Sequence, residues 1–414
     1  MKIGIDARWI FKELSGIGSY TRELIRHLAR LERTHKFVIY FSDPVLRDRT
    51  VAETDLGRAP NFSTCLLPFD LFSIRNQLRL PGLLTEAALD VFHSTNYMIP
   101  LRAFPRLPTP ARSASPSNAG GSLREVLRAG GRSGRIRCVT TIHDLIPLMF
   151  PAYAPRAWKR RLFPLYRWLM HEVARRSDLV ITDSRSARDD VVRHLHLRPE
   201  RVLAIPLGVL PKFQPPAQTD TGVTGWTPGS ARAKQTILWV GRADPYKNLV
   251  GLIEAFAALR KQYQLPVELR IVGPKDRRYP EASRRAAGLG IATAVTWLGY
   301  LPDDRLLSEY QHADVFVQPS WYEGFGLPVL EAFACGTPVI CSNKGSLPEV
   351  SGGAALIVQP QDMIGLTEAM RRVLTDSRLA RDMSARGLRQ ARKFSWEATA
   401  RMTLEAYNKA AQSL

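Results

Sequence analysis

The chain has 414 residues, a formal net charge of +20 and an apolar content of 45%. This length exceeds what one ordinary core supports and predicts two domains of roughly 200 residues each. No apolar run reaches the length that a membrane-spanning helix needs, and the start MKIGIDARWI lacks the pattern of a signal peptide. The sequence therefore predicts no membrane-spanning helix, and it is too long for a small single domain.

The cysteines and the basic residues indicate the cellular location and the kinds of ligand to expect. Cys65, Cys138, Cys335 and Cys341 show neither metal-ligand spacing nor a disulfide framework, which predicts a reducing cytoplasmic location. The basic excess is typical of proteins that bind nucleic acid, anionic lipid or a phosphorylated ligand. A solvated basic surface is the simpler explanation for part of it.

Short runs rich in β-branched residues alternate with amphipathic segments in the first half. Strands are expected at 2–6, 36–41, 90–94, 138–144, 179–184 and 202–209, and helices near 18–31, 72–88, 155–176 and 185–196. Segment 102–137 interrupts this alternation, because it is rich in Arg, Pro, Ser and Gly and has little apolar surface to bury. We expect it to be a flexible basic insertion.

The second half repeats the pattern. Strands are expected at 236–242, 268–273, 295–299, 315–320, 338–342 and 354–359, again with helices between them. Such alternation predicts an α/β fold in which two Rossmann-like, doubly wound parallel-sheet domains face each other. The domains are expected at 1–209 and 234–394, joined by a Pro/Gly/Thr-rich linker at 210–233. A ligand is expected in the inter-domain cleft, beyond the carboxyl ends of the strands.

Two cations follow the first strand of the second domain, in the motif VGRADPYKN. Arg242 and Lys247 lie where this strand ends and the next helix begins. Helix N-termini favour anions, so the pair is suited to hold a diphosphate. Solvated loop charges are the alternative interpretation.

The motif EGFGLPVLE places two carboxylates around a glycine turn. Gly324 and Gly326 allow close approach of the backbone to a ligand, while Glu323 precedes the turn and Glu331 enters the next helix. Each acid alone could be an ordinary loop or helix acid. A glycosidase would use such a pair as acid and base. A sugar nucleotide already carries a good leaving group, however, so cations would hold its diphosphate and the carboxylates would accept hydrogen bonds from its hydroxyls.

Together these motifs resemble the retaining glycosyltransferases of family 4. The resemblance rests on the E-x7-E spacing of Glu323 and Glu331, on GRADPYKN and VTWLGY, and on LPVLEAFACGTPVICSNKGSLPEV. In the first half, MKIGIDARWI, SGIGSYTREL, DVFHSTNYMIP and TIHDLIPLMFP resemble the bacterial mannosyltransferases that build surface polysaccharides. The resemblance implies a GT-B fold whose first domain binds the acceptor and whose second binds the nucleotide-sugar.

The resemblance also implies roles for individual residues. Those matched to the reacting groups are Arg242 and Lys247 on the diphosphate, Glu323 on the donor sugar and His143 beside that sugar. Those matched to further donor contacts are Gly16, Gly18, Gly324, Phe325, Gly326, Leu327, Glu331 on the ribose, and Leu298 within 295–299 near the base. A lone histidine after a strand is otherwise more often structural. Residues 395–414 match a terminal helix that packs back on the first domain.

The expected activity is transfer of a hexose, with mannose from GDP-mannose as the leading choice. The acceptor would be a polyprenyl-diphosphate-linked sugar or an oligosaccharide in O-antigen or exopolysaccharide synthesis. No cofactor or metal is expected, since the chain contains no Asp-x-Asp. The alternatives are a sugar-nucleotide epimerase or a phosphorylase on a similar fold, and a nucleic-acid-binding protein. Nucleic acid is not the expected partner, because the motif residues cluster at strand ends rather than on a recognition helix.

Two stretches that are rich in basic and apolar residues indicate where the chain would contact a membrane that carries the acceptor. Residues 155–177 interleave Trp158, Phe163, Tyr166 and Trp168 with Arg and Lys, and residues 71–84 add a second apolar-basic stretch. This pattern suits peripheral contact with an anionic membrane at the inner face of the plasma membrane. The alternative is a core helix with a basic outer face.

Overall fold

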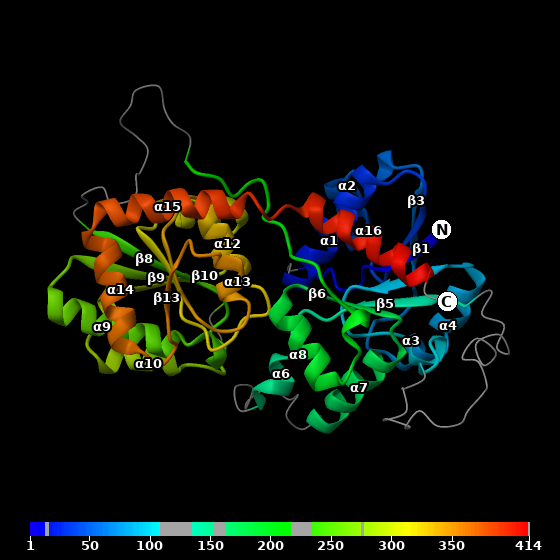
Figure 1. The fold of residues 1–414 in the computed structure, drawn as a ribbon, viewed down its shortest axis with the longest axis horizontal. Helices are drawn as coiled ribbons and strands as arrows, with labels where there is room; N and C mark the ends of the chain where they lie inside the picture. The colour runs from blue at the N-terminus through cyan, green and yellow to red at the C-terminus, as the bar shows by residue number, and fades with distance from the viewer. Residues whose placement is uncertain (13–15, 108–134, 152–161, 217–233, 275–276, 413–414) are drawn as a thin grey trace, which may run out of the picture.

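The computed structural model describes residues 1–12, 16–107, 135–151, 162–216, 234–274 and 277–412. Figure 1 shows two lobes side by side, each built around one parallel sheet. The predicted fold class, two Rossmann-like α/β domains, is confirmed by this architecture.

The first sheet has the strand order β3-β2-β1-β4-β5-β6-β7, with every neighbouring pair parallel. Its strands are β1 (Lys2–Asp6), β2 (Lys36–Phe41), β3 (Phe62–Leu66), β4 (Val91–Ser94), β5 (Arg137–Thr141), β6 (Leu179–Thr182) and β7 (Val202–Ala204). Its α-helices are α1 (Gly16–Leu31), α2 (Pro44–Thr54), α3 (Ile74–Leu78), α4 (Leu80–Glu86), α6 (Ile146–Met149), α7 (Phe163–Arg176) and α8 (Arg185–Leu195). The strand order reverses between β1 and β4, which is where such sheets bind ligands.

The second sheet has the order β10-β9-β8-β11-β12-β13 and is also parallel throughout. Its strands are β8 (Gln235–Val240), β9 (Val267–Val272), β10 (Val295–Gly299), β11 (Val315–Gln318), β12 (Val339–Ser342) and β13 (Leu356–Val358). Its α-helices are α9 (Leu249–Tyr263), α10 (Glu281–Gly288), α11 (Asp303–His312), α12 (Leu327–Ala334), α13 (Leu347–Ser351), α14 (Met363–Thr375) and α15 (Ser377–Ala391). Here the order reverses between β8 and β11.

Helices cover both faces of the second sheet because successive strand residues point to opposite sides. Along β8, Ile237 and Trp239 join the buried cluster that contains α9 and α14, whereas Leu238 joins the cluster that contains α12. Strands buried on both sides read as continuous apolar runs. This is why the sequence shows runs such as TILWV rather than alternation.

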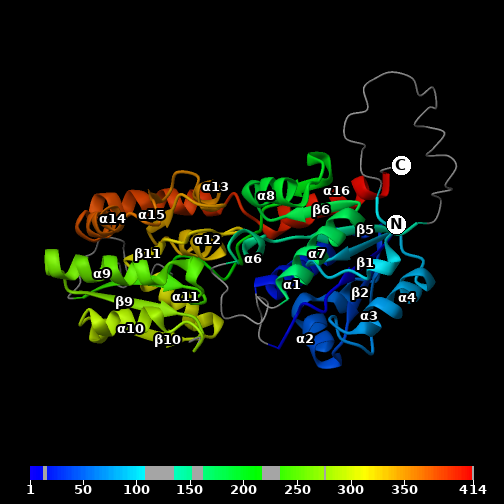
Figure 2. The ribbon, with the colours of Figure 1, turned by 90° about the horizontal axis from the view of Figure 1, so that it is seen from below.

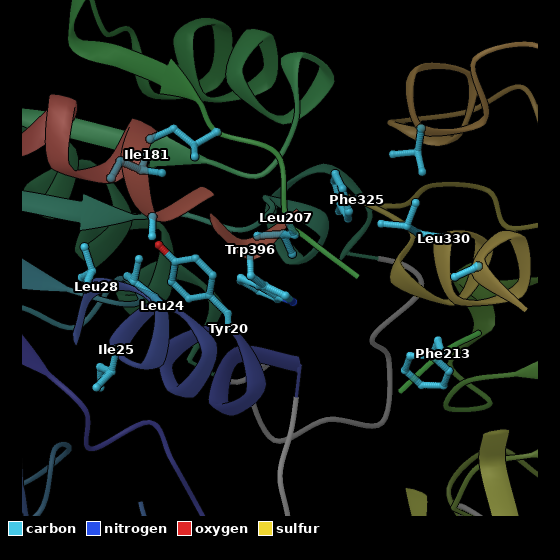
Figure 3. Packing of buried hydrophobic residues seen from close by; sticks show 14 of the residues in the cluster. Tyr20, Leu24, Ile25, Leu28, Ile181, Leu207, Phe213, Phe325, Leu330 and Trp396 are labelled. Atoms are coloured by element: carbon cyan, nitrogen blue, oxygen red, sulfur yellow. The ribbon is translucent and has the colours of Figure 1, made fainter. Parts of the chain in front are cut away.

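The last helix, α16 (Trp396–Gln412), returns to the first domain and packs on α1 and β5 (Figure 2). The Tyr407 hydroxyl lies 2.7 Å from Nδ1 of the buried His93, which anchors the helix to β4. At its start, the buried Trp396 ring lies 6.3 Å from the ring of Tyr20 (Figure 3). The apolar cluster around Trp396 includes residues of both domains, such as Phe325.

The structure corrects several sequence expectations. Strand β3 was not expected, because FSTCL carries polar residues and its side chains are mostly outside the core. The helix expected over 72–88 is two short helices that meet at Arg79, just before Pro81. Residues 152–161 of the expected helix 155–176 lie outside the described residues.

The expected insertion and linker are narrower than the sequence predicted. The bounds predicted for the flexible insertion, 102–137, are too wide at both ends. Arg106 forms an ion pair with Glu172 at 2.7 Å, and Arg137 is the first residue of β5. In the linker, Phe213 is buried and its ring lies 5.7 Å from that of Tyr310. The remainders, 108–134 and 217–233, lie outside the described residues.

Candidate active site

The candidate site lies at the carboxyl ends of β8 and β11, where the strand order of the second sheet reverses. After β8 the chain forms a short 3-10 turn, Pro245–Lys247, and then begins α9. After β11 it forms the glycine turn that leads into α12. Sheet topology thus brings the cationic motif and the acidic motif to one edge.

The two motifs are joined by a direct ion pair between Lys247 and Glu323. Lys247 Nζ donates to both carboxylate oxygens of Glu323, at 2.8 and 2.7 Å. Gln318 Nε2 and Ser320 Oγ donate to Glu323 Oε1 at 2.7 and 2.6 Å. Glu323 is only 5% exposed, so these charge-assisted bonds offset the cost of its burial.

Arg242 lies at the rim of the same edge. Its guanidinium donates two hydrogen bonds to Asp244, at 2.9 and 3.0 Å, and its side chain is 64% exposed. Lys247 is more enclosed and lies 5.3 Å from the centre of the Tyr246 ring. The two residues predicted to bind the diphosphate therefore lie on one loop. The side chain of Arg242 is exposed, and that of Lys247 is largely enclosed.

The glycine turn of the second domain contacts the first domain. A Cβ on Gly324 would lie 2.9 Å from the His143 carbonyl oxygen and 3.0 Å from Asp144 Cβ, so only glycine fits without a shift. Ser184 Oγ donates to the Gly324 carbonyl at 2.7 Å. Gly326, at φ 95°, takes the left-handed conformation that precedes α12.

The neighbours of the glycine turn hold its shape. Phe325 is buried in the core, and Leu327 is the first residue of α12. Ser346 Oγ donates to the Glu323 and Phe325 carbonyls at 3.0 and 2.7 Å. The backbone of the turn is therefore fixed before any ligand enters.

His143 lies two residues after the end of β5, and each of its ring nitrogens lies within hydrogen-bond distance of an oxygen. Nδ1 lies 2.7 Å from Asp183 Oδ2, and Nε2 lies 3.1 Å from the Thr95 carbonyl. Burial opposes the charged ring, but the charge and hydrogen bond of Asp183 outweigh it and raise the pKa of His143 above its usual value. Because both partners are acceptors, this geometry favours the doubly protonated imidazolium.

Asp144 is a candidate that the sequence reasoning missed. It follows His143 in the motif TIHD, and burial raises the pKa of its carboxyl, helped by the nearby charges of Asp183 and Glu323. Its Oδ1 accepts from the Ile146 amide at 3.0 Å. Its position next to His143 in the motif TIHD could have identified Asp144 from the sequence. No comparable motif pointed to Asp183, Gln318 or Ser320.

Glu331 occupies a separate part of the edge, on α12. Its Oε2 accepts from the Tyr310 hydroxyl at 2.8 Å, and burial raises the pKa of its carboxyl to about 7. Its other charged neighbours are Lys212 and Asp303. The two acids of the E-x7-E motif therefore have different partners, Lys247 for Glu323 and Tyr310 for Glu331.

The remaining predicted residues flank these groups. Gly16 and Gly18 form the first turn of α1, whose Tyr20 ring packs edge-on against His143 at 4.9 Å. Residues 13–15, just before them, lie outside the described residues. Leu298 lies in β10, partly buried against the core.

The residues that the structure describes contain neither a metal-binding cluster nor a membrane-spanning helix. Over these residues, no group of His, Cys, Asp or Glu side chains is arranged to hold a metal ion. Over the same part of the chain, no helix has both the length and the apolar character required to span a bilayer.

Comparisons with known proteins agree with this architecture. A family model described as "Glycosyl transferases group 1" matches residues 227–390, and one described as "Glycosyl transferase 4-like domain" matches residues 15–208. The "O-antigen chain mannosyltransferase B" of Escherichia coli is 27% identical over 420 residues, which cover 98% of this chain and 99% of that protein.

Two further similar proteins cover different shares of the chain. The "MMP alpha-(1->4)-mannosyltransferase" of Mycolicibacterium hassiacum is 33% identical over 267 residues, 62% of this chain and 61% of that protein. The structure of Anabaena HepE in complex with UDP-glucose has a TM-score of 0.69 at 16% identity, covering 99% of this chain and 100% of that one. This structural likeness shows the fold.

The two matched models cover both domains, and the second covers the loops that carry Arg242, Lys247 and Glu323. The chain is therefore a glycosyltransferase of the GT-B type. It belongs to the family 4 glycosyltransferases.

Proposed function

We propose that the chain is a retaining mannosyltransferase that acts in bacterial surface polysaccharide synthesis. The observation that carries the proposal is the Lys247–Glu323 pair, buried beside a glycine turn that faces His143 of the first domain. The choice of sugar is supported by the two bacterial relatives above, both named as mannosyltransferases.

The donor is a nucleoside diphosphate sugar, with GDP-mannose as the specific choice. Arg242 and Lys247 bind the diphosphate, together with the first turn of α1 at Gly16 and Gly18. Glu323 accepts hydrogen bonds from the sugar hydroxyls, and Glu331 does so from the ribose. The 298–299 end of β10 lies on the side of the base.

Transfer breaks the bond between C1 of the sugar and the diphosphate oxygen and forms a bond between C1 and the acceptor oxygen. The acceptor hydroxyl gives its proton to the departing diphosphate on the same face, so the configuration at C1 is retained. Negative charge grows on the diphosphate as it leaves, and Arg242 and Lys247 stabilise it there. These cations fill the role that a metal ion has in other glycosyltransferases, so no cofactor is required.

The imidazolium of His143 adds a third positive charge to those of Arg242 and Lys247, opposite the glycine turn. Its ring is oriented by Asp183 and the Thr95 carbonyl. A fixed cation at this point stabilises negative charge on the donor from the side of the first domain. His143 therefore completes the site when the two domains meet.

The acceptor is a lipid-diphosphate-linked or oligosaccharide chain at the inner face of the plasma membrane. Helix α7 exposes the apolar side chains of Leu165 and Trp168, and Leu162 precedes it. The same stretch carries Arg167, Arg175 and Arg176. Apolar and cationic groups together suit peripheral contact with anionic lipid.

The test is a donor screen followed by a transfer assay. GDP-mannose, UDP-glucose, UDP-galactose and UDP-N-acetylglucosamine are compared by thermal shift, where a ligand at about 100 times its Kd stabilises by about 2.7 kcal/mol. We expect GDP-mannose to give the largest shift and a product whose anomeric configuration, read by NMR, matches the donor. An inverted product would overturn the mechanism, and conversion of donor without any acceptor would indicate an epimerase instead.

A further inference from the structure

Helix α8 of the first domain lies at the boundary between the two lobes and contacts the glycine turn of the second domain (Figure 2). Ser184, the residue at the N-cap of α8, donates from its Oγ to the Gly324 carbonyl at 2.7 Å. Further along the helix, Oδ2 of Asp190 accepts from the Tyr322 hydroxyl. Tyr322 and Gly324 are the residues on either side of Glu323, so α8 holds both chain neighbours of the acid proposed to bind the donor sugar.

The side chain of Tyr322 packs into the first domain, although its backbone belongs to the second. The residue is only 5% exposed, and its ring lies 5.6 Å from the ring of Phe150, which follows α6. Burial, together with the hydrogen bond to Asp190, raises the pKa of the Tyr322 hydroxyl above its usual value, so the hydroxyl keeps its proton and remains the donor. The ring and the hydroxyl therefore both attach Tyr322 to the first domain.

Asp190 is a buried acid that the proposed mechanism does not use. The residue is 7% exposed, and burial of a carboxyl group is costly unless hydrogen bonds replace those that it made to water. A hydrogen bond to a carboxylate is also stronger than one between two neutral groups. The bond from Tyr322 joins residues that are 132 positions apart in the chain, so it is a specific link between the two domains.

Contacts within the second domain hold other atoms of the same stretch of chain. The carboxylate of Glu323 accepts from Lys247 Nζ, and its carbonyl accepts from Ser346 Oγ at 3.0 Å. Neither of these contacts reaches the side chain of Tyr322 or the carbonyl of Gly324, which α8 holds instead. The direction in which the peptide presents the Glu323 side chain therefore depends on contact with the first domain.

We propose that Asp190, acting through Tyr322, positions Glu323 for the reaction, a role that rests on the proposed function. Groups that act on a substrate must be held closely in place, and a displacement of about 1 Å can cost about 100-fold in rate. The bond between Asp190 and Tyr322 fixes the residue directly before Glu323, so the acid faces the donor sugar in one direction. Asp190 acts through another side chain and is therefore a positioning residue, not a catalytic one.

Another contact between α8 and the second domain provides a matched control. Glu349, in α13, accepts from the Arg185 amide at 3.0 Å, and its side chain is 26% exposed. This contact joins the same two domains but does not involve a chain neighbour of Glu323. If α8 only holds the domains together, loss of either contact has the same effect on turnover. If Asp190 positions Glu323, only loss of the Tyr322 contact lowers the rate of the reaction.

The test compares variants of the full chain by the release of nucleoside diphosphate, with methyl α-mannotrioside or water as acceptor. Tyr322→Phe removes the hydroxyl but keeps the ring against Phe150, and Asp190→Ala removes the acceptor of the same bond. We expect each to lower kcat about tenfold. Asp190→Asn keeps an acceptor oxygen and is expected to regain most of that rate, while Glu349→Ala is expected to stay within about twofold of the wild type. If Asp190→Ala fails to fold, Tyr322→Phe still reports on the bond.

A double variant shows whether the effect passes through Glu323. In a Glu323→Ala background, Tyr322→Phe is expected to lower kcat by less than about twofold more, because the side chain that it positions is already gone. Nucleoside diphosphate without a sugar does not meet Glu323 in the proposed site, so its Kd is expected to be unchanged in Tyr322→Phe. Additive losses of kcat, or weaker binding of nucleoside diphosphate, indicate a general structural loss and contradict the positioning role.

The wild type alone decides the proposed function, through the donor screen and the transfer assay. The comparison of variants uses whichever nucleotide-sugar the wild type accepts, so it does not require GDP-mannose to be the donor. Equal losses of kcat in Tyr322→Phe and Glu349→Ala, with an active wild type, overturn the positioning role and leave the proposed function standing. A wild type that accepts no nucleotide-sugar overturns both.

Discussion

Lys247 Nζ lies 2.7 and 2.8 Å from the two carboxylate oxygens of Glu323, a residue 76 positions further along the chain. The cation proposed for the diphosphate and the acid proposed for the sugar thus pair with each other in the unliganded chain. We expect donor binding to replace this ion pair with one contact from each side chain to the substrate. Loss of one partner therefore affects both folding and catalysis.

Lys247→Ala is expected to lower kcat by roughly 100-fold or more, because one stabiliser of the leaving diphosphate is lost. It also leaves Glu323 buried without its counter-charge, which costs about 3–5 kcal/mol of folding free energy. Steady-state kinetics and urea unfolding measure the two effects.

A double variant and a surface control make the Lys247 result specific. Lys247→Ala combined with Glu323→Gln is expected to regain stability but not activity, since the buried charge is gone while the cation is still missing. Lys234→Ala, which removes a surface partner of Glu268, is expected to change stability by less than about 1 kcal/mol. A raised KM with unchanged kcat in Lys247→Ala would show uniform binding instead.

Asp183→Asn is expected to lower the pKa of His143. The carboxylate of Asp183 raises that pKa despite burial, so its neutralisation moves the titration of the ring to lower pH. Imidazole NMR shifts measure the midpoint in the wild type and the variant. Asp189→Asn, which changes an exposed carboxylate on α8, serves as the control and leaves the midpoint in place. An unchanged midpoint in Asp183→Asn contradicts the ion pair.

Glu331→Gln is expected to stabilise the unliganded chain at pH 8 but not at pH 4. Burial raises the pKa of Glu331 to about 7, so the folded state holds the proton more tightly than the unfolded state. This contribution is fully present below the ordinary carboxyl pKa and is lost as the pH rises towards 7. Glutamine needs no proton and loses nothing over that window.

The measurement for Glu331 is the unfolding midpoint across pH, for the wild type, Glu331→Gln and the exposed control Glu397→Gln. Only the difference between the wild type and Glu331→Gln is expected to change between about pH 4.5 and 7. The same variant is expected to bind the donor more weakly, because the ribose loses a charged acceptor. Parallel pH curves for all three proteins would contradict the raised pKa.

Activity is expected to survive exhaustive treatment with EDTA. We expect Arg242 and Lys247 to balance the charge that forms on the diphosphate, and chelators do not remove these side chains. Turnover is measured before and after treatment, with and without added Mg²⁺ or Mn²⁺. Loss on chelation that either ion restores would contradict the metal-free mechanism.

The sequence by itself determined the fold class and the family. Strand–helix alternation is a local property, and so is the position of a glycine turn or a cation directly after a strand. The motifs around Arg242 and Glu323 could therefore be placed at strand ends without coordinates. Local patterns failed at strand β3, which was not predicted, and at 72–88, where one predicted helix is two. The residues in both segments have weak local preferences for one secondary structure.

Only the tertiary structure decided which of these groups meet. Sheet order sets Lys247 beside Glu323, and domain packing sets Ser184 against Gly324, 140 residues away. The contact between the rings of Trp9 and Tyr97, 5.7 Å apart, likewise depends on β1 and β4 being neighbours in the sheet. Contacts between residues far apart in the chain follow from how the domains pack, and short-range patterns carry no information about that packing.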